Sequence, residues 1–397
     1  MTTRRDTLNL LGGALLAGCA MMRNRMRDRV ATHVDRGEIP GAVTLVSRRG
    51  EVEVETIGVT SFGGTTPMRR DTIFRVSSMT KPISAVAAMM LVEEGKLRLD
   101  EPVDRILPEL ANRRVLKRLD GPLDDTVPAR RAITLRDLIT LRMGFGIVLG
   151  PGGFAPIPIV KAAEDLQLGA FGPPRPLVPP APDEWMRRFS TLPLMAQPGE
   201  KWMYNTGFEV LGVLLARASG KPLETLYRER VFEPLGMKDT SFSVPASKLD
   251  RFTTSYWMDK QVYDGIENSQ WGRPPPFPSA SAGLVSTVDD FLAFGRMKGL
   301  LSPASIEAMT TDQITPEQKA ISPFFPDFWT GRGWGFGVSI NTRRPGTPGG
   351  FGWDGGLGTS WATDPKEDLV AILMTQGAGP PQMSSTYADF WDTVYPS

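Results

Sequence analysis

Strand-like patterns lie near both ends of this 397-residue chain, and helical patterns fill the stretch between them. Short runs rich in β-branched residues, broken by Arg49-Gly50, occupy residues 39–61 and are typical of antiparallel strands. Further strand-like runs follow at 334–341, 358–365 and 368–376. Because the residues between these regions are mostly helical in pattern, we expect a sheet whose strands come from both ends of the chain.

Helical periodicity is clearest at residues 77–97, where Ile83, Val86, Ala87 and Met90 form one apolar stripe. Gly95 follows the last of these residues and is expected to end the helix. Further helical patterns cover residues 22–36, 133–143, 206–219 and 385–395.

The order of these patterns predicts an α+β fold with two domains. Residues 21–76 and 245–397 are expected to form an antiparallel sheet flanked by helices, and residues 77–244 an inserted, mostly helical domain. Within the latter, residues 144–182 hold nine prolines and seven glycines. This composition predicts a long loop without regular structure that shapes a site, with a disordered surface insertion as the alternative.

The charge balance and the rarity of histidine and cysteine exclude several classes of function. Lys plus Arg number 45 and Asp plus Glu 44, so the net charge is +1, which leaves no excess charge for binding a nucleic acid. His33 and Cys19 are the only residues of their types, which excludes His-rich metal sites, cysteine clusters and an internal disulfide. No metal or other cofactor is expected, and His33 is expected to be a packed or surface residue.

Residues 1–20 resemble an export signal. Arg4 and Arg5 precede an apolar run at residues 8–20, which is too short to span a bilayer and suits the core of a signal peptide. The sequence Leu-Ala-Gly-Cys ending at Cys19 resembles a bacterial lipoprotein cleavage box. These features predict export to the bacterial cell envelope or periplasm, with lipidation at Cys19 as a membrane anchor. The alternative is an uncleaved N-terminal helix in a cytoplasmic enzyme.

Ser78 and Lys81 are the first candidate catalytic pair. They are three residues apart at the start of the predicted helix, so their side chains share one face. A serine hydroxyl becomes a good nucleophile when a base takes its proton, and a lysine can be that base if burial lowers its pKa. The N-terminus of a helix also favours negative charge developing beside it. The alternative is a solvated pair in the first turn.

Four segments of the chain resemble the serine β-lactamase and penicillin-binding-protein superfamily. Within it, the chain looks like the class C β-lactamase branch and the related family VIII serine esterases, from about residue 38 to residue 376. The resemblance implies a β-lactamase-like fold and a reaction through an acyl-enzyme on Ser78. The segments are FRVSSMTKPISA (74–85), EEGKLRLDEPV (93–103), VFEPLGMKDTSF (231–242) and SAGLVSTVDDFLAF (281–294).

The same branch has a catalytic tyrosine followed two residues later by an asparagine. Aligned from Pro198-Gly199, Tyr204 matches the tyrosine, but Asn205 is adjacent to it and Thr206 takes the asparagine position. The resemblance therefore implies a catalytic Tyr204 and a lost asparagine. A phenol beside a lysine ammonium can be held as phenolate and exchange protons with the nucleophile and the leaving group. The alternative is a core tyrosine.

The third motif of β-lactamases, Lys-Thr-Gly, corresponds to Trp353-Asp354-Gly355 here, which looks like the Trp-x-Gly variant of the esterase relatives. Tryptophan offers an apolar face and one N–H donor in place of a charge that attracts a carboxylate. The resemblance implies that the N–H groups of Ser78 and Gly356 bind the oxyanion; a glycine-rich hairpin with a packing tryptophan is the alternative. Trp202, Asn205 and Trp361 are further expected pocket residues.

The sequence as a whole predicts a serine hydrolase that cleaves short-chain carboxylic esters, a carboxylesterase of the β-lactamase family. A β-lactamase or D-amino-acid (DD-) peptidase on the same scaffold is one alternative. A penicillin-binding-type sensor that is acylated without turnover is the other. The expected partner is a small ester or lactam substrate, and the oligomeric state stays open.

Overall fold

The computed structural model describes residues 25–150, 153–169, 171–258, 260–342, 346–377 and 385–395. The predicted export segment and Cys19 lie outside these residues, so export and anchoring stay predictions. Among the described helices, none is both long enough and apolar enough to cross a membrane. The described His, Asp and Glu side chains form no group of three that could hold a metal ion.

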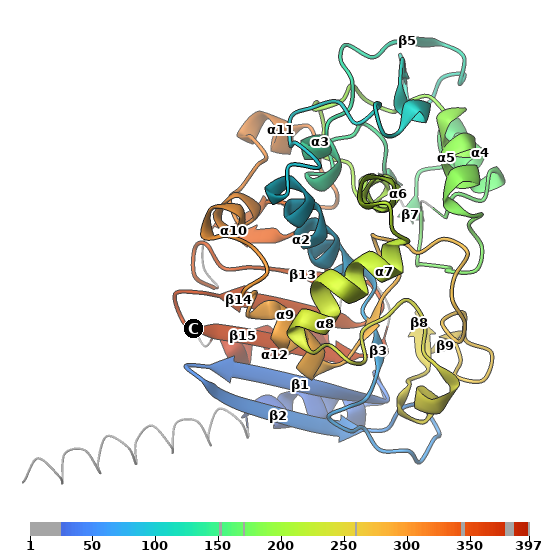
Figure 1. Ribbon diagram of the computed structural model, residues 1–397. Coiled ribbons are helices and arrows are strands. Elements are labelled where there is room, and N and C mark those ends of the chain that lie inside the picture. Colours follow the sequence, from blue (N-terminus) through green and yellow to red (C-terminus); the bar gives the residue numbers. More distant parts are fainter. Residues whose placement is uncertain are drawn as a thin grey trace, which may run out of the picture.

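One seven-stranded antiparallel sheet is built from both ends of the chain, as expected for the predicted α+β fold (Figure 1). Its order is β11-β12-β13-β14-β15-β1-β2, so the N-terminal pair extends the C-terminal strands. The predicted strand at 334–341 is two short strands, because a turn through Gly335 and Gly337 divides it. The strands are β1 (Gly41–Arg48), β2 (Glu51–Gly58), β11 (Arg332–Trp334), β12 (Ser339–Asn341), β13 (Phe351–Gly355), β14 (Thr359–Asp364) and β15 (Leu369–Thr375).

Helices cover both faces of this sheet. Along β1, Val43 and Leu45 belong to the main core, whereas Ala42 and Val46 belong to a second cluster on the opposite face, as the two-residue period of a strand requires. The helix at residues 25–35 and α12 (Ser385–Val394) pack on the second cluster, and α9 (Val288–Gly295) packs against β1 and β15 from the other side.

His33 joins the two helices that cover the second cluster. Its ring is buried, with Nδ1 at 2.5 Å from Glu38 Oε2 and Nε2 at 2.8 Å from Asp389 Oδ2 on α12. The histidine is therefore a packed residue that ties the N-terminal helix to the C-terminal one.

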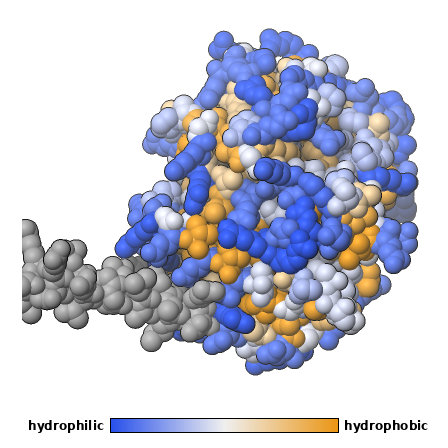
Figure 2. Space-filling model, turned by 60° about the horizontal axis from the view of Figure 1, so that its bottom comes forward, coloured by the Kyte–Doolittle hydropathy of each residue, from blue (hydrophilic) through white to orange (hydrophobic). Residues whose placement is uncertain are grey.

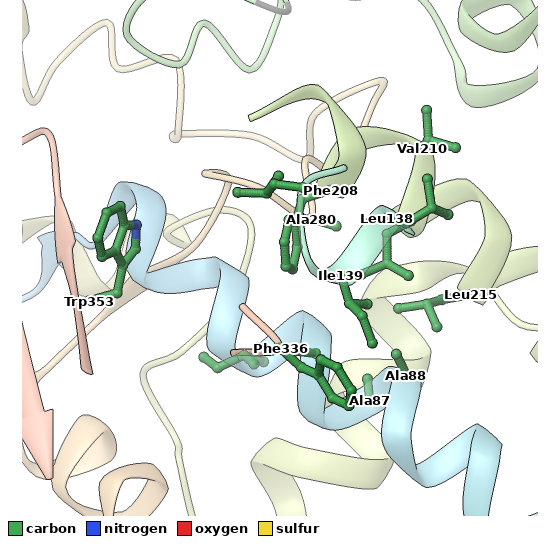
Figure 3. Packing of buried hydrophobic residues seen from close by; sticks show 14 of the residues in the cluster. Ala87, Ala88, Leu138, Ile139, Phe208, Val210, Leu215, Ala280, Phe336 and Trp353 are labelled. Atoms are coloured by element: carbon green, nitrogen blue, oxygen red, sulfur yellow. The ribbon is translucent and has the colours of Figure 1, made fainter. Parts of the chain in front are cut away.

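The main core extends from the sheet into the helical part of the molecule, with α2 (Thr80–Glu93) at its centre. Every residue of α2 from Thr80 to Leu91 is buried, so the helix is covered on all sides and not only along the predicted apolar stripe. Figure 3 shows side chains of the neighbouring elements packed around it, with Trp353 pointing from the sheet toward its first turn. The neighbours are α3 (Leu135–Ile139), α6 (Thr206–Ser219) and α7 (Leu223–Tyr227).

The proline-rich segment at 144–182 is more regular than its composition predicts. It contains the short strands β6 (Leu149–Gly150) and β7 (Gly153–Phe154) and the helix α4 (Pro158–Asp165). Three residues of α4 are buried in the main core. The expectation of a loop without regular structure is therefore wrong for its middle, because Pro158 occupies the first turn of a helix, where a missing N–H costs no hydrogen bond.

On the face seen in Figure 2, hydrophobic residues form separate patches between hydrophilic ones. Shorter strands and helices complete the fold around the sheet and α2. These elements are β3 (Phe74–Arg75), β4 (Arg114–Leu116), β5 (Thr126–Pro128), β8 (Ser255–Trp257), β9 (Gln261–Asp264), β10 (Val285–Ser286), α5 (Pro182–Ser190), α8 (Glu233–Leu235), α10 (Pro303–Met309) and α11 (Pro316–Ala320).

Candidate active site

Ser78 lies in a short 3₁₀ turn, Ser77–Met79, that leads from β3 into α2. Ser77 has a φ of +44°, which is a strained conformation for a residue with a side chain and is characteristic of functional sites. The Thr80 hydroxyl donates to the Ser77 carbonyl oxygen at 2.7 Å and holds this turn. Ser78 is half-buried, whereas Lys81 is fully buried one turn later.

Lys81 is positioned to accept a proton from Ser78. Its Nζ lies 3.2 Å from Ser78 Oγ, 2.8 Å from Asn205 Oδ1 and 2.9 Å from the Ser281 carbonyl oxygen. Burial lowers the pKa of Lys81 to about 7, against the opposing effect of Glu209. An uncharged amine has two N–H groups and one lone pair. The two carbonyl oxygens can only accept, so they take the N–H groups, and the lone pair faces the Ser78 hydroxyl.

Tyr204 completes the group that the sequence predicts. Its hydroxyl is hydrogen-bonded to Ser78 and accepts the indole N–H of Trp353 at 2.9 Å. Lys81 Nζ lies 4.4 Å from the centre of its ring. Burial raises the pKa of Tyr204 well above its ordinary value. The site therefore favours a neutral phenol, which can donate a proton, and not the phenolate that the sequence led us to consider.

Asn205 supplies the contact that the sequence comparison assigned to Thr206, so the prediction of a lost asparagine is wrong. The backbone of Asn205 has a φ of +93°, and this turn brings its side-chain oxygen to Lys81. Thr206 begins α6, and its buried hydroxyl has no hydrogen-bond partner. Counting forward from Tyr204 missed the asparagine, because a residue count does not show the backbone turn at Asn205 that brings its side chain to Lys81.

β13 runs beside the turn that carries Ser78. A side chain at Gly355 would meet the Val76 carbonyl oxygen at 2.3 Å, so only glycine allows this close approach, whereas a side chain at Gly356 would enter open space. Within the described residues, no backbone oxygen accepts from the N–H of Ser78 or of Gly356. Both groups are thus available, and their role as oxyanion donors stays a prediction.

Asp354 lies between Trp353 and Gly355 in the sequence, but its side chain does not face the catalytic group. Its carboxylate accepts the Ser360 hydroxyl at 2.5 Å, and burial raises its pKa. Neighbouring residues of a strand point to opposite faces, so Asp354 faces away from Tyr204 and supports the pairing of β13 with β14. The expectation that Asp354 contacts substrate is not supported.

Aromatic rings form one wall of the site. Trp202 stacks on Tyr204 with ring centres 5.6 Å apart, which agrees with its predicted place in the pocket. Trp361 instead packs on Phe291 and Phe294 of α9 and donates its N–H to Thr363, so its ring packs in the core and not on Tyr204. Further rings of the wall are Phe324, Phe328, Trp329, Trp334 and Trp353.

Two charged residues that sequence reasoning missed lie close to this group. Glu209 is buried on α6. It accepts a hydrogen bond from Ser279 and lies within hydrogen-bond distance of Ser281. Its position four residues after Asn205, on the same helical face, is a signal that could have found it. Arg332 lies with its guanidinium 4.8 Å from the ring centre of Phe328 and 5.8 Å from that of Trp353. No local sequence pattern marks it.

Arg332 is unusual because no residue in the described part of the chain forms an ion pair with its charge. Its Nη1 is buried without a hydrogen bond, and no carboxylate within the described residues forms an ion pair with it. Burial lowers its pKa, and Asp354 compensates its charge only at a distance. A cavity of about 400 Å³ is lined by Arg332, Trp353 and Trp361 together with Asp392 and Tyr395 near the C-terminus, whereas Ser78, Lys81 and Tyr204 do not line it.

This fold, with a serine, a lysine and a tyrosine meeting at one site, defines a serine hydrolase. The model of the Beta-lactamase family matches residues 26–391, and the chain belongs to that family. Esterase EstB of Burkholderia gladioli is 31% identical over 85% of this chain and 86% of its own length. Protein Rv1367c of Mycobacterium tuberculosis is 40% identical over 86% of this chain and 87% of its own.

A solved structure supports the same assignment. The structure of EstCE1, described as a hydrolase with promiscuous acyltransferase activity, is 25% identical to this chain. It matches with a TM-score of 0.75 over 94% of this chain and 98% of its own. The chain is therefore an enzyme of the hydrolase type with a β-lactamase-like fold.

Proposed function

We propose that this enzyme is a carboxylesterase that cleaves short-chain esters through an acyl-enzyme on Ser78. The observation that carries the proposal is the contact of Lys81 Nζ with Ser78 Oγ at 3.2 Å, with two carbonyl oxygens as the other partners of Nζ. In an uncharged amine this arrangement leaves the lone pair facing Ser78. The tryptophan at position 353, in place of a lysine that would attract a carboxylate, supports an ester over a lactam. The similarity to a named esterase supports the same class.

In the acylation step, Ser78 Oγ bonds to the ester carbonyl carbon while its proton passes to Lys81 Nζ. The carbonyl electron pair moves onto the oxygen, and the N–H groups of Ser78 and Gly356 stabilise that charge. When the intermediate collapses, the C–O bond to the alcohol breaks, and the departing oxygen takes the proton of Tyr204. Once the alcohol has left, water that enters the site carries a proton from the Lys81 ammonium to the Tyr204 phenolate, because the acylated Ser78 Oγ has no proton to relay.

Deacylation repeats these steps with water as the nucleophile. Water attacks the acyl carbon as Lys81 takes one of its protons, and Ser78 Oγ leaves with the proton of Tyr204. The free Ser78 hydroxyl, which contacts both groups, then passes a proton from Lys81 to Tyr204. The raised pKa of Tyr204 suits this scheme, because a neutral phenol is ready to donate when the alkoxide forms.

The test of this proposal compares two chromogenic substrates. We expect kcat/KM for p-nitrophenyl butyrate to exceed that for a cephalosporin by at least about 100-fold, since the site lacks the lysine that would bind the lactam carboxylate. Initial rates with the same enzyme preparation measure the ratio. A higher rate on the cephalosporin would make the enzyme a β-lactamase. A burst equal to the enzyme concentration, followed by no turnover of either substrate, would make it a sensor.

A further inference from the structure

Glu209 is a buried carboxyl group connected to the catalytic lysine by a continuous series of polar contacts. Its Oε1 lies 2.9 Å from Ser281 Oγ, which lies 2.8 Å from Asn205 Oδ1. The same Asn205 oxygen lies 2.8 Å from Lys81 Nζ. Ser279 Oγ donates a further hydrogen bond to Glu209 Oε1 at 2.8 Å. The acylation scheme above does not use this carboxyl group.

The hydrogens available in this series decide its protonation state. Ser281 has one hydroxyl hydrogen but contacts two oxygens, Asn205 Oδ1 and Glu209 Oε1. An amide oxygen cannot donate, so Ser281 donates to Asn205 and Glu209 donates to Ser281. Rotating the Asn205 amide would place its NH₂ against Lys81 and occupy the lone pair that faces Ser78. The orientation that leaves the lysine free to act as a base therefore requires a proton on Glu209.

Burial points to the same state. Glu209 is 5% exposed, and its Oε2 has no hydrogen-bond partner. An ionised carboxylate needs several donors, and leaving one of its oxygens without any is costly in the interior. Burial raises the pKa of Glu209 and lowers that of Lys81, so both groups favour their uncharged forms.

We propose that Glu209 is a positioning residue that carries a proton in the resting enzyme and, through Ser281 and Asn205, holds Lys81 as the uncharged base. The inference rests on the proposed function, because it concerns the base of that reaction. Its consequence is that Glu209 places no negative charge near Lys81 to stabilise an ammonium before substrate binds.

Within the described residues, the other titratable groups that act on Glu209 and Lys81 or on their neighbours are Tyr204, Tyr227 and Asp354. Tyr227 on α7 donates to Ser84 at 2.6 Å and is close enough to Glu209 for that carboxyl group to contribute to its raised pKa. Tyr204 lies against Lys81, and Asp354 of β13 affects Tyr204 from the sheet side. Burial raises the pKa of both tyrosines, so neither is charged at neutral pH. A change at Glu209 can therefore be read directly in the behaviour of Lys81.

The experiment uses Glu209→Gln, which keeps the size of the side chain and its ability to donate to Ser281. We expect kcat/KM for p-nitrophenyl butyrate to stay within about threefold of wild type. The acid limb of the pH profile is expected to stay in place, because no charge has been removed. Glu209→Leu removes the donor and is expected to lower kcat by about tenfold or more with little change in KM. Glu164→Gln, at an exposed position on α4, is the matched control.

Two results would overturn the proposal. If Glu209 were ionised, Glu209→Gln would remove a negative charge beside Lys81 and move the acid limb down by about one pH unit or more. Infrared difference spectra of wild type and Glu209→Gln give a readout that needs no substrate. The carbonyl band of a protonated carboxyl group is expected to disappear in the variant, and an unchanged band region would contradict a protonated Glu209. This measurement stands even if the enzyme acts on something other than esters.

Discussion

Ser78→Ala is expected to lower kcat for p-nitrophenyl butyrate by about 10⁵-fold, because the nucleophile and its proton acceptor act as a unit. Without Oγ, Lys81 has no proton to take and no acyl-enzyme can form. The rate that remains comes from the oxyanion donors and from substrate binding alone. The fold should persist, since the side chain is half-buried and its hydrogen bonds go to Lys81 and Tyr204, which are themselves part of the reaction.

Steady-state rates, with the acyl-enzyme followed by mass spectrometry after rapid mixing, measure the effect. Wild type is expected to gain the mass of one butyryl group and the variant none. Ser247→Ala, at an exposed position, is the control for the substitution itself. Near-full activity in Ser78→Ala would remove Ser78 from the reaction, and a butyryl group on the variant would place the nucleophile elsewhere.

Local spacing made part of this site predictable. Ser78 and Lys81 share a face because a helix fixes the geometry of residues three apart, and the structure brings them to 3.2 Å. Periodicity also predicted that the sheet takes its strands from both ends of the chain. Short runs of apolar or alternating residues indicate strands in a sequence, and such runs lie near both ends of this chain. Tyr204 needed the resemblance, since nothing local marks a tyrosine as catalytic.

The parts that escaped prediction depend on backbone conformation or on tertiary contact. Asn205 reaches Lys81 only through a φ of +93°, which no residue count predicts. Glu209 and Arg332 were missed because a charged residue in a sequence is usually solvated, and their burial results from elements distant in the chain. α4 was missed because its prolines suggested a loop, although a proline is well placed in the first turn of a helix.

Lys81→Met is expected to lower kcat by about 10³-fold or more, because it removes the base and keeps most of the volume of the side chain. In wild type, Lys81 has a pKa of about 7, so kcat/KM should fall as the pH drops through this value and the amine becomes an ammonium that cannot accept a proton. The methionine variant should lose this acid limb along with its activity. A pH–rate profile of both proteins measures it.

Lys81→Met is expected to lower activity but to increase the stability of the folded chain at acidic pH. The two effects together distinguish a chemical role of Lys81 from a structural one. The pKa of Lys81 is lower in the folded chain than the ordinary value of 10.5, so between these two values the unfolded chain binds more protons, and stability increases with pH. Below about pH 7 both states are protonated and the cost of the buried charge is complete. Lys81→Met should therefore raise the melting temperature at acidic pH, and this gain should shrink as the pH rises. A variant that is both inactive and less stable at acidic pH would show that the buried amine supports the fold and is not held there as a base.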